Sequence, residues 1–485
     1  MNYNSALFTD LYSLTMAQGY WKKNMNKETV FEMFFRRQPF EGGFSIFAGL
    51  GTFLQKLQAF SFTQEDLDYL KTLKIFEDDF IKYLENFRFT GSLWAMKEGT
   101  VIFPQEVLVR IQGRIVECQI IEGLILNTIN FQSLIATKTA RVWLGSGKGK
   151  IMEFGLRRAQ GVDGAMSASR AAFIGGAIAT SNVLAGKEYE IPVVGTMAHS
   201  WIMAFQDEKE AFQTYADIYP ERPVFLIDTY NTLKSGAPNA IEVGKRLALE
   251  GKNFGVRLDS GDIHYLSVEV RKMLDKEGLN QAIISVSNDL DEYIVKALTD
   301  AGAPINVWGV GTQMVTGGSE SAFTGVYKLT ALNDDEGNLI PTMKCSDNPD
   351  KTTNPGVKQV WRIKDAQGMT VADIMAFDEP DITEKIEKGK KYTFWHTAGD
   401  YRFFQHAIEG SVEPLLTLWM DKGKIVKETP SLKEIQQFVQ KDLESFDSSY
   451  KRFLKPHVYK VSITDNLRQL KLKLIKNYSE GSVNK

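Results

Sequence analysis

Six short apolar runs, most of them ending in a small or polar residue, constrain the fold of this chain more than any other feature. They read KIMEFG, IPVVGT, PVFLIDT, FGVRLDS, AIISVSN and INVWGVG. Successive runs start about 20 to 40 residues apart with helix-like stretches between them, which is the spacing of βα units on a parallel sheet. No run is followed by G-x-G-x-x-G, and no G-x-x-x-x-G-K-[ST] occurs, so the two commonest nucleotide loops are absent. We therefore expect a (β/α) barrel, complete or incomplete, rather than an open nucleotide-binding sheet.

The segments on either side of these runs read differently. LFTDLYSLTMAQGYW and LILNTINFQSLIATKTARV predict helices, and the second is placed to connect two domains. SFTQEDLDYLKTL predicts a helix with a capping box formed by Thr63 and Asp66. EVLVRIQGRIVECQII predicts paired strands around Gly113, LNDDEGNLIP a hairpin, and RQLKLKLIKNYSEGSVNK a basic helix that frays. We expect an N-terminal mixed α/β domain over 1–135, the barrel over 136–332, and a strand-rich C-terminal segment over 333–485.

Composition excludes several classes of protein. The 485 residues carry 57 Lys and Arg against 60 Asp and Glu, a formal net charge of −3, which argues against a mainly electrostatic nucleic-acid binder. Cys118 and Cys345 are the only cysteines, which suits a reducing compartment and excludes a disulfide framework. The N-terminal stretch lacks a signal-peptide pattern, and no apolar run is long enough to span a membrane. We expect a soluble cytoplasmic protein.

Charged residues gather where the runs end, and parallel strands bring such ends together at one edge. Arg157 and Arg158 are either a solvated pair or a fork for a carboxylate or phosphate. Arg257 is placed to hold an anionic group. The aspartates at these ends are either helix caps or ligands for Mg²⁺ on a polyphosphate. The candidates for this role are Asp228, Asp259 and Asp262.

The last two runs have the chemistry of a phosphate cradle. Asn288 precedes a predicted helix, and GVGT offers bare backbone N–H groups and one hydroxyl. The residues concerned in that motif are Gly309, Gly311 and Thr312.

His199 is one of only five histidines. Either it is a packed core residue, or it acts as base or nucleophile at the barrel mouth, where Thr196 precedes it and Ser200 follows. The other histidines show no metal-ligand spacing.

Taken in order, these segments resemble the nicotinate phosphoribosyltransferase family over about residues 5 to 365. The matching strings include TDLYSLTMAQGYW, FRRQPFEGGFSIFAGL, EFGLRRAQGVDGAMSASRAAFIGG, GTMAHSW, LIDTYNT, VRLDSGD and GVGT. The resemblance implies the type II phosphoribosyltransferase fold, an irregular, partly open α/β barrel with a flanking mixed α/β domain built from N- and C-terminal segments. It also implies ATP-coupled transfer of a phosphoribosyl group from phosphoribosyl pyrophosphate to nicotinate, with Mg²⁺, in NAD salvage.

The resemblance assigns roles to individual residues. His199 matches the histidine that ATP phosphorylates, and Thr312 matches a phosphoribosyl pyrophosphate contact. Tyr12, Thr196 and Arg257 match nicotinate contacts, with Tyr12 supplied by the second subunit of a homodimer. Beside these we place Arg157 and Ser200 on nicotinate, Asp259 in catalysis, and Asp228, Asn288, Gly309 and Gly311 on phosphoribosyl pyrophosphate, with Asp259 and Asp262 at the metal.

Other functions stay open on the sequence. A nicotinamide phosphoribosyltransferase would favour a carboxylate or amide over Arg257, and a quinolinate enzyme would need more cationic contacts. A barrel that only binds a phosphate ligand as a sensor would lack the combination of Tyr12, His199, Arg257 and Thr312.

Overall fold

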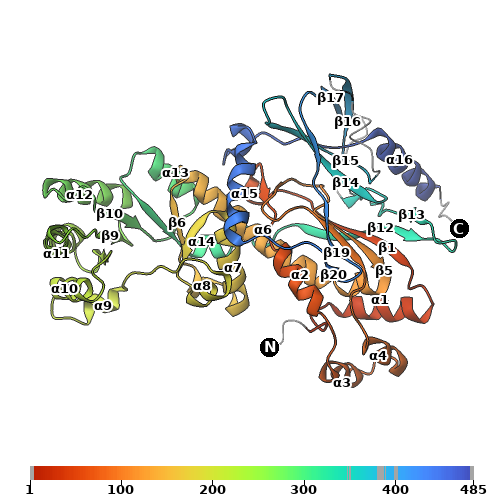
Figure 1. Cartoon of the computed structure of the whole chain (residues 1–485), viewed down its shortest axis with the longest axis horizontal. Helices are drawn as coiled ribbons and strands as arrows, with labels where there is room; N and C mark the ends of the chain where they lie inside the picture. The colour runs from red at the N-terminus through yellow and green to blue at the C-terminus, as the bar shows by residue number, and fades with distance from the viewer. Residues whose placement is uncertain are drawn as a thin grey trace. The chain divides into compact units, whose positions relative to one another are not determined.

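A computed structural model of the chain describes residues 5–346, 348, 351–378, 387, 389–397 and 402–480. The chain divides into two compact units, Met1–Leu134 with Ala322–Lys485, and Ile135–Ser321. Figure 1 shows the second unit in orange to green. The predicted frayed end beyond residue 480 lies outside the described residues.

The second unit is built on a six-stranded sheet in the order β7-β6-β11-β10-β9-β8, and every pairing in it is parallel. β7 and β8 form the two edges, so the sheet curls without closing, and the expected partly open α/β barrel is confirmed. The strands are β6 (Lys150–Glu153), β7 (Ala177–Thr180), β8 (Val224–Leu226), β9 (Gly255–Leu258), β10 (Ile283–Val286) and β11 (Val307–Val310).

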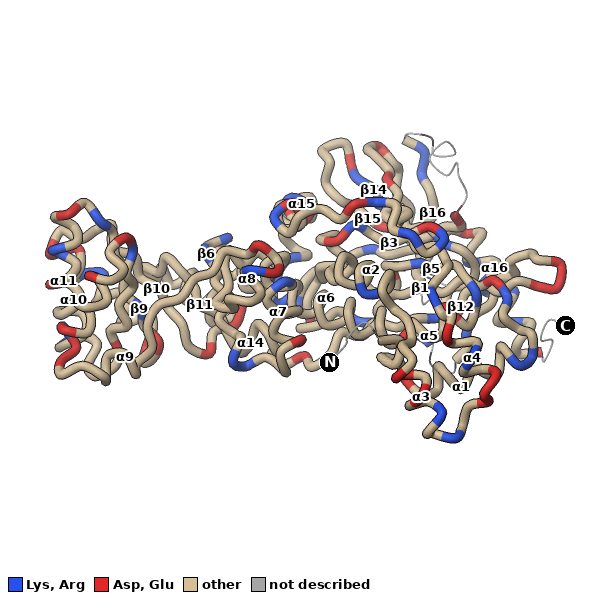
Figure 2. Tube along the Cα trace, turned by 60° about the horizontal axis from the view of Figure 1, so that its bottom comes forward, with Lys and Arg blue, Asp and Glu red and all other residues tan. Residues whose placement is uncertain are grey.

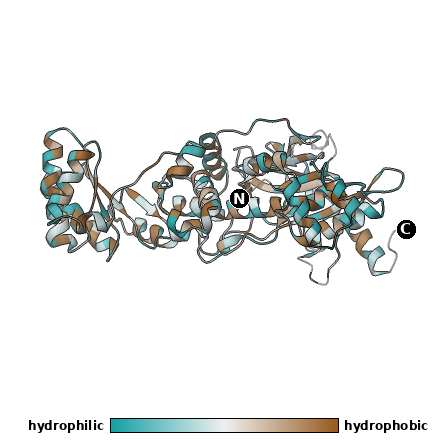
Figure 3. Cartoon of the chain, turned by 90° about the horizontal axis from the view of Figure 1, so that it is seen from below, coloured by the Kyte–Doolittle hydropathy of each residue, from teal (hydrophilic) through white to brown (hydrophobic). Residues whose placement is uncertain are grey.

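One or more helices follow most of these strands along the chain and pack apolar residues into the core. α12 buries Ile263, Ser267, Val270 and Leu274, which recur at helical spacing and so form one stripe. Figure 3 shows hydrophobic and hydrophilic sides on the outer helices of this unit. The helices are α7 (Gly161–Gly175), α8 (Val183–Tyr189), α9 (His199–Met203), α10 (Glu208–Ile218), α11 (Ala237–Leu249), α12 (Ile263–Lys276), α13 (Glu292–Asp300) and α14 (Thr312–Val315), with short turns η2 (Leu156–Arg158) and η3 (Thr232–Gly236).

One predicted strand of the barrel is wrong. Residues 191–196 form only an isolated bridge between Thr180 and Val193, and the edge strand is β7, inside a stretch that the sequence assigned to a helix. The helix stops because Gly176 takes a φ of 122°, a conformation that turns the chain into β7 and that other residues rarely adopt. This segment forms two hydrogen bonds with Thr180: the carbonyl oxygen of Pro192 accepts from the N–H of Thr180, and the N–H of Val194 donates to the carbonyl oxygen of Thr180. Pro192 itself has no N–H to donate.

The first unit combines the two ends of the chain in mixed α/β layers. Its seven-stranded sheet has the order β13-β12-β1-β5-β3-β19-β20, its six-stranded sheet the order β17-β16-β21-β15-β14-β18, and β2 pairs with β4. Its strands are β1 (Glu28–Phe35), β2 (Ser45–Ile46), β3 (Ser92–Ala95), β4 (Val101–Ile102), β5 (Val109–Arg114), β12 (Gly325–Asn333), β13 (Leu339–Pro341), β14 (Lys358–Lys364), β15 (Thr370–Phe377), β16 (Lys391–His396), β17 (Phe403–Ala407), β18 (Val412–Pro414), β19 (Thr417–Asp421), β20 (Lys424–Ile425) and β21 (Val461–Ile463). Its helices are α1 (Leu11–Lys22), η1 (Pro39–Glu41), α2 (Leu50–Ala59), α3 (Gln64–Thr72), α4 (Asp78–Leu84), α5 (Ile115–Ile120), α15 (Leu432–Glu444), η5 (Ser448–Lys451) and α16 (Asp465–Ser479), and α6 (Glu122–Gly145) continues into the second unit.

Several local predictions for this unit are confirmed. Thr63 and Asp66 form both hydrogen bonds of the capping box at α3, and β12 and β13 form the predicted hairpin.

Two other predictions for this unit are wrong. Residues 322–332, which the sequence assigned to the barrel, belong to the first unit instead, because β12 pairs antiparallel with β1. The second strand predicted after Gly113 is the helix α5. All six residues of α5 are buried, and an apolar run without periodicity does not distinguish helix from strand.

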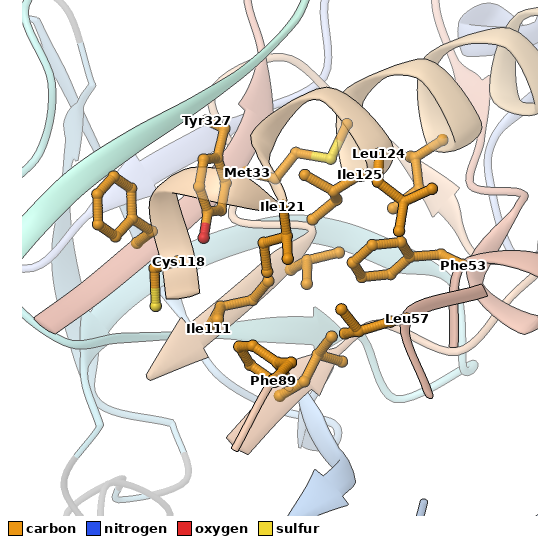
Figure 4. Close-up of a cluster of buried hydrophobic side chains, with 14 of the residues drawn as sticks. Met33, Phe53, Leu57, Phe89, Ile111, Cys118, Ile121, Leu124, Ile125 and Tyr327 are labelled. Carbon is orange, nitrogen blue, oxygen red and sulfur yellow. The ribbon is translucent and has the colours of Figure 1, made fainter. Parts of the chain in front are cut away.

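The core of the first unit joins both ends of the chain. Met33, Ile111 and Tyr327 come from β1, β5 and β12 and pack with Leu124 and Ile125 of α6 (Figure 4). Their burial supplies the hydrophobic stabilisation that holds the long helix against the sheet.

A buried charge cluster links β14 to neighbouring segments. Arg362 donates hydrogen bonds to Asp373, Asp442 and the carbonyl oxygen of Val101. Burial first, and then the negative charge of Asp373, raise the pKa of Glu106 well above its ordinary value. The charge of Arg362 opposes this rise and lowers the pKa of Glu106.

Within the described residues, no helix combines the length and hydrophobicity needed to cross a membrane. Figure 2 shows Lys and Arg interspersed with Asp and Glu along the described chain, as the near-neutral composition predicts.

Candidate active site

The carboxyl ends of β6, β9, β10 and β11 meet around a polar pocket of about 170 Å³. Three guanidinium groups and two carboxylates line it, so the pocket has an excess of positive charge and suits an anionic ligand. The pocket brings together seven of the predicted site residues, namely Arg157, Arg257, Asp259, Asn288, Gly309, Gly311 and Thr312, and also Phe154, Arg158, Ser287 and Asp289.

Arg257 is the most constrained of the three arginines. Its Nη1 donates a hydrogen bond to Oγ1 of Thr196, while its Nε is buried without a hydrogen-bond partner among the described residues. The pKa of Arg257 is lowered overall, and burial is the main cause. The charges of Asp259 and Asp228 oppose this change, and the charge of Arg157 adds to it. A guanidinium remains charged at neutral pH. Arg257 is therefore a partly dehydrated cation at the pocket, and its Nε–H is free to donate a hydrogen bond to a ligand.

Two aspartates rigidify the turn after β9. Oδ2 of Asp228 accepts hydrogen bonds from the backbone N–H of Asp259 at 2.9 Å and from the Ser260 hydroxyl at 2.6 Å. Oδ1 of Asp259 accepts from the hydroxyl of Ser287. Oδ1 of Asp228 is buried and has no hydrogen-bond partner in the described chain. Because a buried oxygen without a donor is costly, this atom is a candidate contact for a ligand hydroxyl or a cation.

His199 is the first residue of the short helix α9 and follows a loop, whereas the sequence placed it after a strand. Its Nδ1 lies 3.1 Å from Oγ1 of Thr229, and its Nε2 lies 3.9 Å from Oδ2 of Asp259. The imidazole is 39% exposed, so His199 is not a packed core residue. Ser200 is exposed at the next position of α9.

The loop after β10 stores backbone strain at the pocket. Asn288 has a φ of 111°, in a region that residues with a Cβ rarely occupy, and its Oδ1 accepts a hydrogen bond from the N–H of Asp289. Such strain persists only where the surroundings enforce it, and it is concentrated at functional sites.

Asp262 has the capping role that the sequence left open. Its Oδ1 accepts a hydrogen bond from the N–H of Tyr265 at 3.0 Å, at the N-terminus of α12. No cluster of three or more His, Cys, Asp or Glu residues suited to a metal occurs in the described parts of the chain.

Tyr12 lies in the first unit, on α1, and its side chain is half exposed. Burial of the hydroxyl end and the nearby carboxylate of Glu122 raise the pKa of Tyr12 to about 12. Tyr12 therefore keeps its proton at any physiological pH and presents an uncharged ring.

Besides Phe154 and Asp289 of the pocket lining, two hydroxyl residues that contact site residues were not selected from the sequence. Thr229 follows Asp228 at the end of β8 and contacts His199, and Ser287 precedes Asn288 and contacts Asp259. Each is a hydroxyl at a strand end, which is the same signal that identified its neighbour, but hydroxyls there are too common to be selected without geometry.

Comparison with known proteins gives the same family for three segments that together cover most of the chain. Sequence models match residues 7–130 as the nicotinate phosphoribosyltransferase N-terminal domain, 149–367 as the nicotinate phosphoribosyltransferase family, and 357–471 as the C-terminal domain. The nicotinate phosphoribosyltransferase of Bacillus subtilis (strain 168) is 42% identical over 472 residues, which cover 97% of this chain and 95% of that protein.

Solved structures agree. The crystal structure of human nicotinic acid phosphoribosyltransferase matches with a TM-score of 0.84 at 30% identity, covering 96% of this chain and 99% of the human chain. The nicotinate-nucleotide pyrophosphorylase of Pyrococcus furiosus shares the fold, with a TM-score of 0.69 at 23% identity over 91% of this chain and 95% of that one. On its sequence and its fold, the chain belongs to the nicotinate phosphoribosyltransferase family.

Proposed function

We propose that this chain transfers the phosphoribosyl group of 5-phosphoribosyl 1-diphosphate to nicotinate, giving nicotinate mononucleotide and pyrophosphate for NAD salvage. The observation that carries the proposal is the pocket in which Arg157, Arg158 and Arg257 face Asp259 beside the GVGT turn. It offers a fork for a carboxylate and backbone N–H groups for phosphate within one site.

The arginines select the acceptor. Arg257, with Arg157 beside it, binds the nicotinate carboxylate, and Thr196 holds the guanidinium in place. The pyridine nitrogen is the nucleophile, so no residue is needed to activate it. It attacks C1 of the ribose as the bond to pyrophosphate breaks, and positive charge develops on the ribosyl carbon in the transition state.

The glycine-rich turn binds the other substrate. The backbone N–H groups at Gly309 and Gly311, the Thr312 hydroxyl and the Asn288 amide bind the phosphates. Asp228 and Asp259 carry the negative charge that favours an electron-poor ribosyl carbon. The buried Oδ1 of Asp228 is free to accept a hydrogen bond from a ribose hydroxyl.

Magnesium fits the donors of this site. The buried unpartnered oxygen of Asp228 and the carboxylate of Asp259 are hard oxygen ligands, and Mg²⁺ commonly takes only one or two carboxylates together with substrate phosphates and water. When bound, Mg²⁺ neutralises the leaving pyrophosphate. Asp259 is the favoured protein ligand, because Asp262 is engaged as a helix cap.

His199 couples the reaction to ATP. Its imidazole takes the γ-phosphoryl group of ATP, leaving ADP, and hydrolysis of the phosphohistidine returns the free imidazole. The phosphohistidine adds negative charge next to Asp259 and within reach of the arginines, which changes how tightly the cationic pocket holds its ligands. The exposed ring and its contact with Thr229 support this role.

The working form is a homodimer with shared sites. Tyr12 of a second copy stacks its neutral ring on the pyridine, and its half-exposed position on α1 supports a contact outside its own unit.

Both cysteines are free, which supports a cytoplasmic location.

The test is pyrophosphate release with nicotinate, nicotinamide or quinolinate, each with and without ATP. We expect release with nicotinate, stimulated by ATP. A preference for nicotinamide or quinolinate, or no release with any base, would refute the proposal.

His199→Ala tests the coupling step. The variant should lose turnover-linked ATP hydrolysis and labelling from the γ-phosphate of ATP, while retaining slow transfer without ATP. His264→Ala on α12 is the matched control and should couple normally. Normal coupling in His199→Ala would exclude the phosphohistidine.

A further inference from the structure

Glu153, the last residue of β6, is a buried carboxylate that the proposed chemistry does not use. It is 1% exposed. One oxygen accepts from the backbone N–H of Gly155, and the other accepts from the hydroxyl of Ser169 at 2.9 Å and from the hydroxyl of Thr180. Both oxygens are therefore used, and the carboxylate ties the end of β6 to α7 and to β7.

Gly155, the residue that Glu153 holds, begins the turn that carries the arginines. The N–H of Arg158 donates to the carbonyl oxygen of Gly155 at 2.8 Å, so η2 starts from this residue. A Cβ at Gly155 would lie 2.2 Å from Val315 of α14, so the turn has no room to move toward that helix. The carboxylate and the packing together set where Arg157 and Arg158 enter the pocket.

The rest of the network is independent of this turn. The single hydroxyl proton of Ser169 is shared between Glu153 and the carbonyl oxygen of Ala165, and the Thr180 hydroxyl also accepts from the N–H of Asn182. Loss of Ser169 therefore weakens the packing of α7, but it leaves the bond between Glu153 and Gly155 in place.

We infer that Glu153 is a positioning residue that fixes the Gly155–Arg158 turn and so aims Arg157 at the anionic substrate. The inference rests on the proposed function only in assigning the nicotinate carboxylate to Arg157. Glu153 is buried and does not line the pocket. Its effect on substrate passes through the backbone of the turn.

Two substitutions distinguish the length of the Glu153 side chain from its charge. Glu153→Asp keeps the charge but withdraws the carboxylate by one methylene, about 1.5 Å, so it no longer spans Gly155 and the two hydroxyls. Glu153→Gln keeps the reach. Its amide oxygen accepts from Gly155, and its NH₂ group donates to the two hydroxyls, which reverse their roles because a hydroxyl both donates and accepts.

The experiment compares Glu153→Asp, Glu153→Gln and Ser169→Ala for KM of nicotinate, kcat and Tm. We expect Glu153→Asp to raise KM by about tenfold or more, since misplacing a binding group by about 1 Å has effects up to a hundredfold. Glu153→Gln should stay within about threefold of the parent KM. Ser169→Ala should lower Tm without raising KM. A KM that follows Tm across all three variants would overturn the inference, because it would indicate a merely structural role.

A second measurement tests the route through Arg157. In the Arg157→Ala background, Glu153→Asp should change KM by less than about twofold, because the two residues act in series. Full additivity of the two changes would overturn the inference. A parent enzyme without transferase activity would instead refute the proposed function, so the two failures are distinguishable.

Discussion

Arg257→Gln is the sharpest test of the proposed substrate contact. The guanidinium has one donor engaged with Thr196 and a buried Nε without a partner, so it can offer two charge-assisted hydrogen bonds to a carboxylate. Two such bonds at the lower end of their range contribute about 3 kcal/mol. Since about 1.4 kcal/mol is a factor of ten, KM for nicotinate should rise roughly 100-fold.

The same substitution should cost little stability. It removes one hydrogen bond to Thr196, worth about 1 kcal/mol, and it also removes a partly buried cation whose lowered pKa reflects the cost of burial. Tm should fall by about 2–4 °C.

The assay is steady-state pyrophosphate release with nicotinate and nicotinamide, alongside thermal unfolding. Arg257→Lys is the matched control. It keeps a charge but loses the planar fork, and its KM should lie between those of the parent and Arg257→Gln. The preference for nicotinate over nicotinamide should shrink in Arg257→Gln, because nicotinamide carries no carboxylate. An unchanged KM and preference in a folded variant would refute the assignment.

Three further predictions concern packing, strain and pH. Gly155→Ala places a Cβ 2.2 Å from Val315 and should cost about 1–3 kcal/mol in the free energy of unfolding, which denaturant titration measures. At Asn288, with φ of 111°, the Gly variant should unfold at a higher temperature than the Ala variant, and the reverse order would show that the backbone is not strained. Glu106 has a raised pKa in the folded state, so its stabilising contribution is complete below the unfolded pKa and is lost as the pH rises through the folded one. Glu106→Gln mimics the protonated form, and its Tm should exceed the parent's by on the order of 2–4 °C at alkaline pH, with the gap closing in acid.

The barrel was predictable because the regular spacing of its apolar strands and intervening helices is visible in the sequence. Five of the six predicted runs became strands of the sheet. The sixth failed where Pro192 and Gly195 interrupt an apolar run, and β7 was hidden because AIAT continues the small-residue composition of α7. The helix α5 was missed for a similar reason, because burial on all sides removes the periodicity that identifies a helix.

The residue types of the site were predictable from the sequence, but the hydrogen-bond partners of its residues were not. Charged and polar residues and glycines at strand ends pointed to the pocket, and seven of them line it. The sequence did not separate Asp262, a helix cap, from Asp259, a pocket residue, since both aspartates occur in VRLDSGD. The separation depends on where α12 begins. Glu153 carries no signal in sequence, because its importance lies in bonds to residues 16 and 27 positions away.

The discontinuous sheet of the first unit has a consequence for synthesis of the protein. β1 pairs with both β5 and β12, and β3 pairs with β19, so this sheet needs strands from both ends of the chain. Residues 135–321 form their parallel sheet from one continuous stretch. On the ribosome, the barrel can therefore complete its hydrogen-bonded sheet while β1 still exposes its β12 edge. The β12 edge of β1 stays open until the last third of the chain emerges, and the β19 edge of β3 stays open longer still, so both edges can aggregate during synthesis.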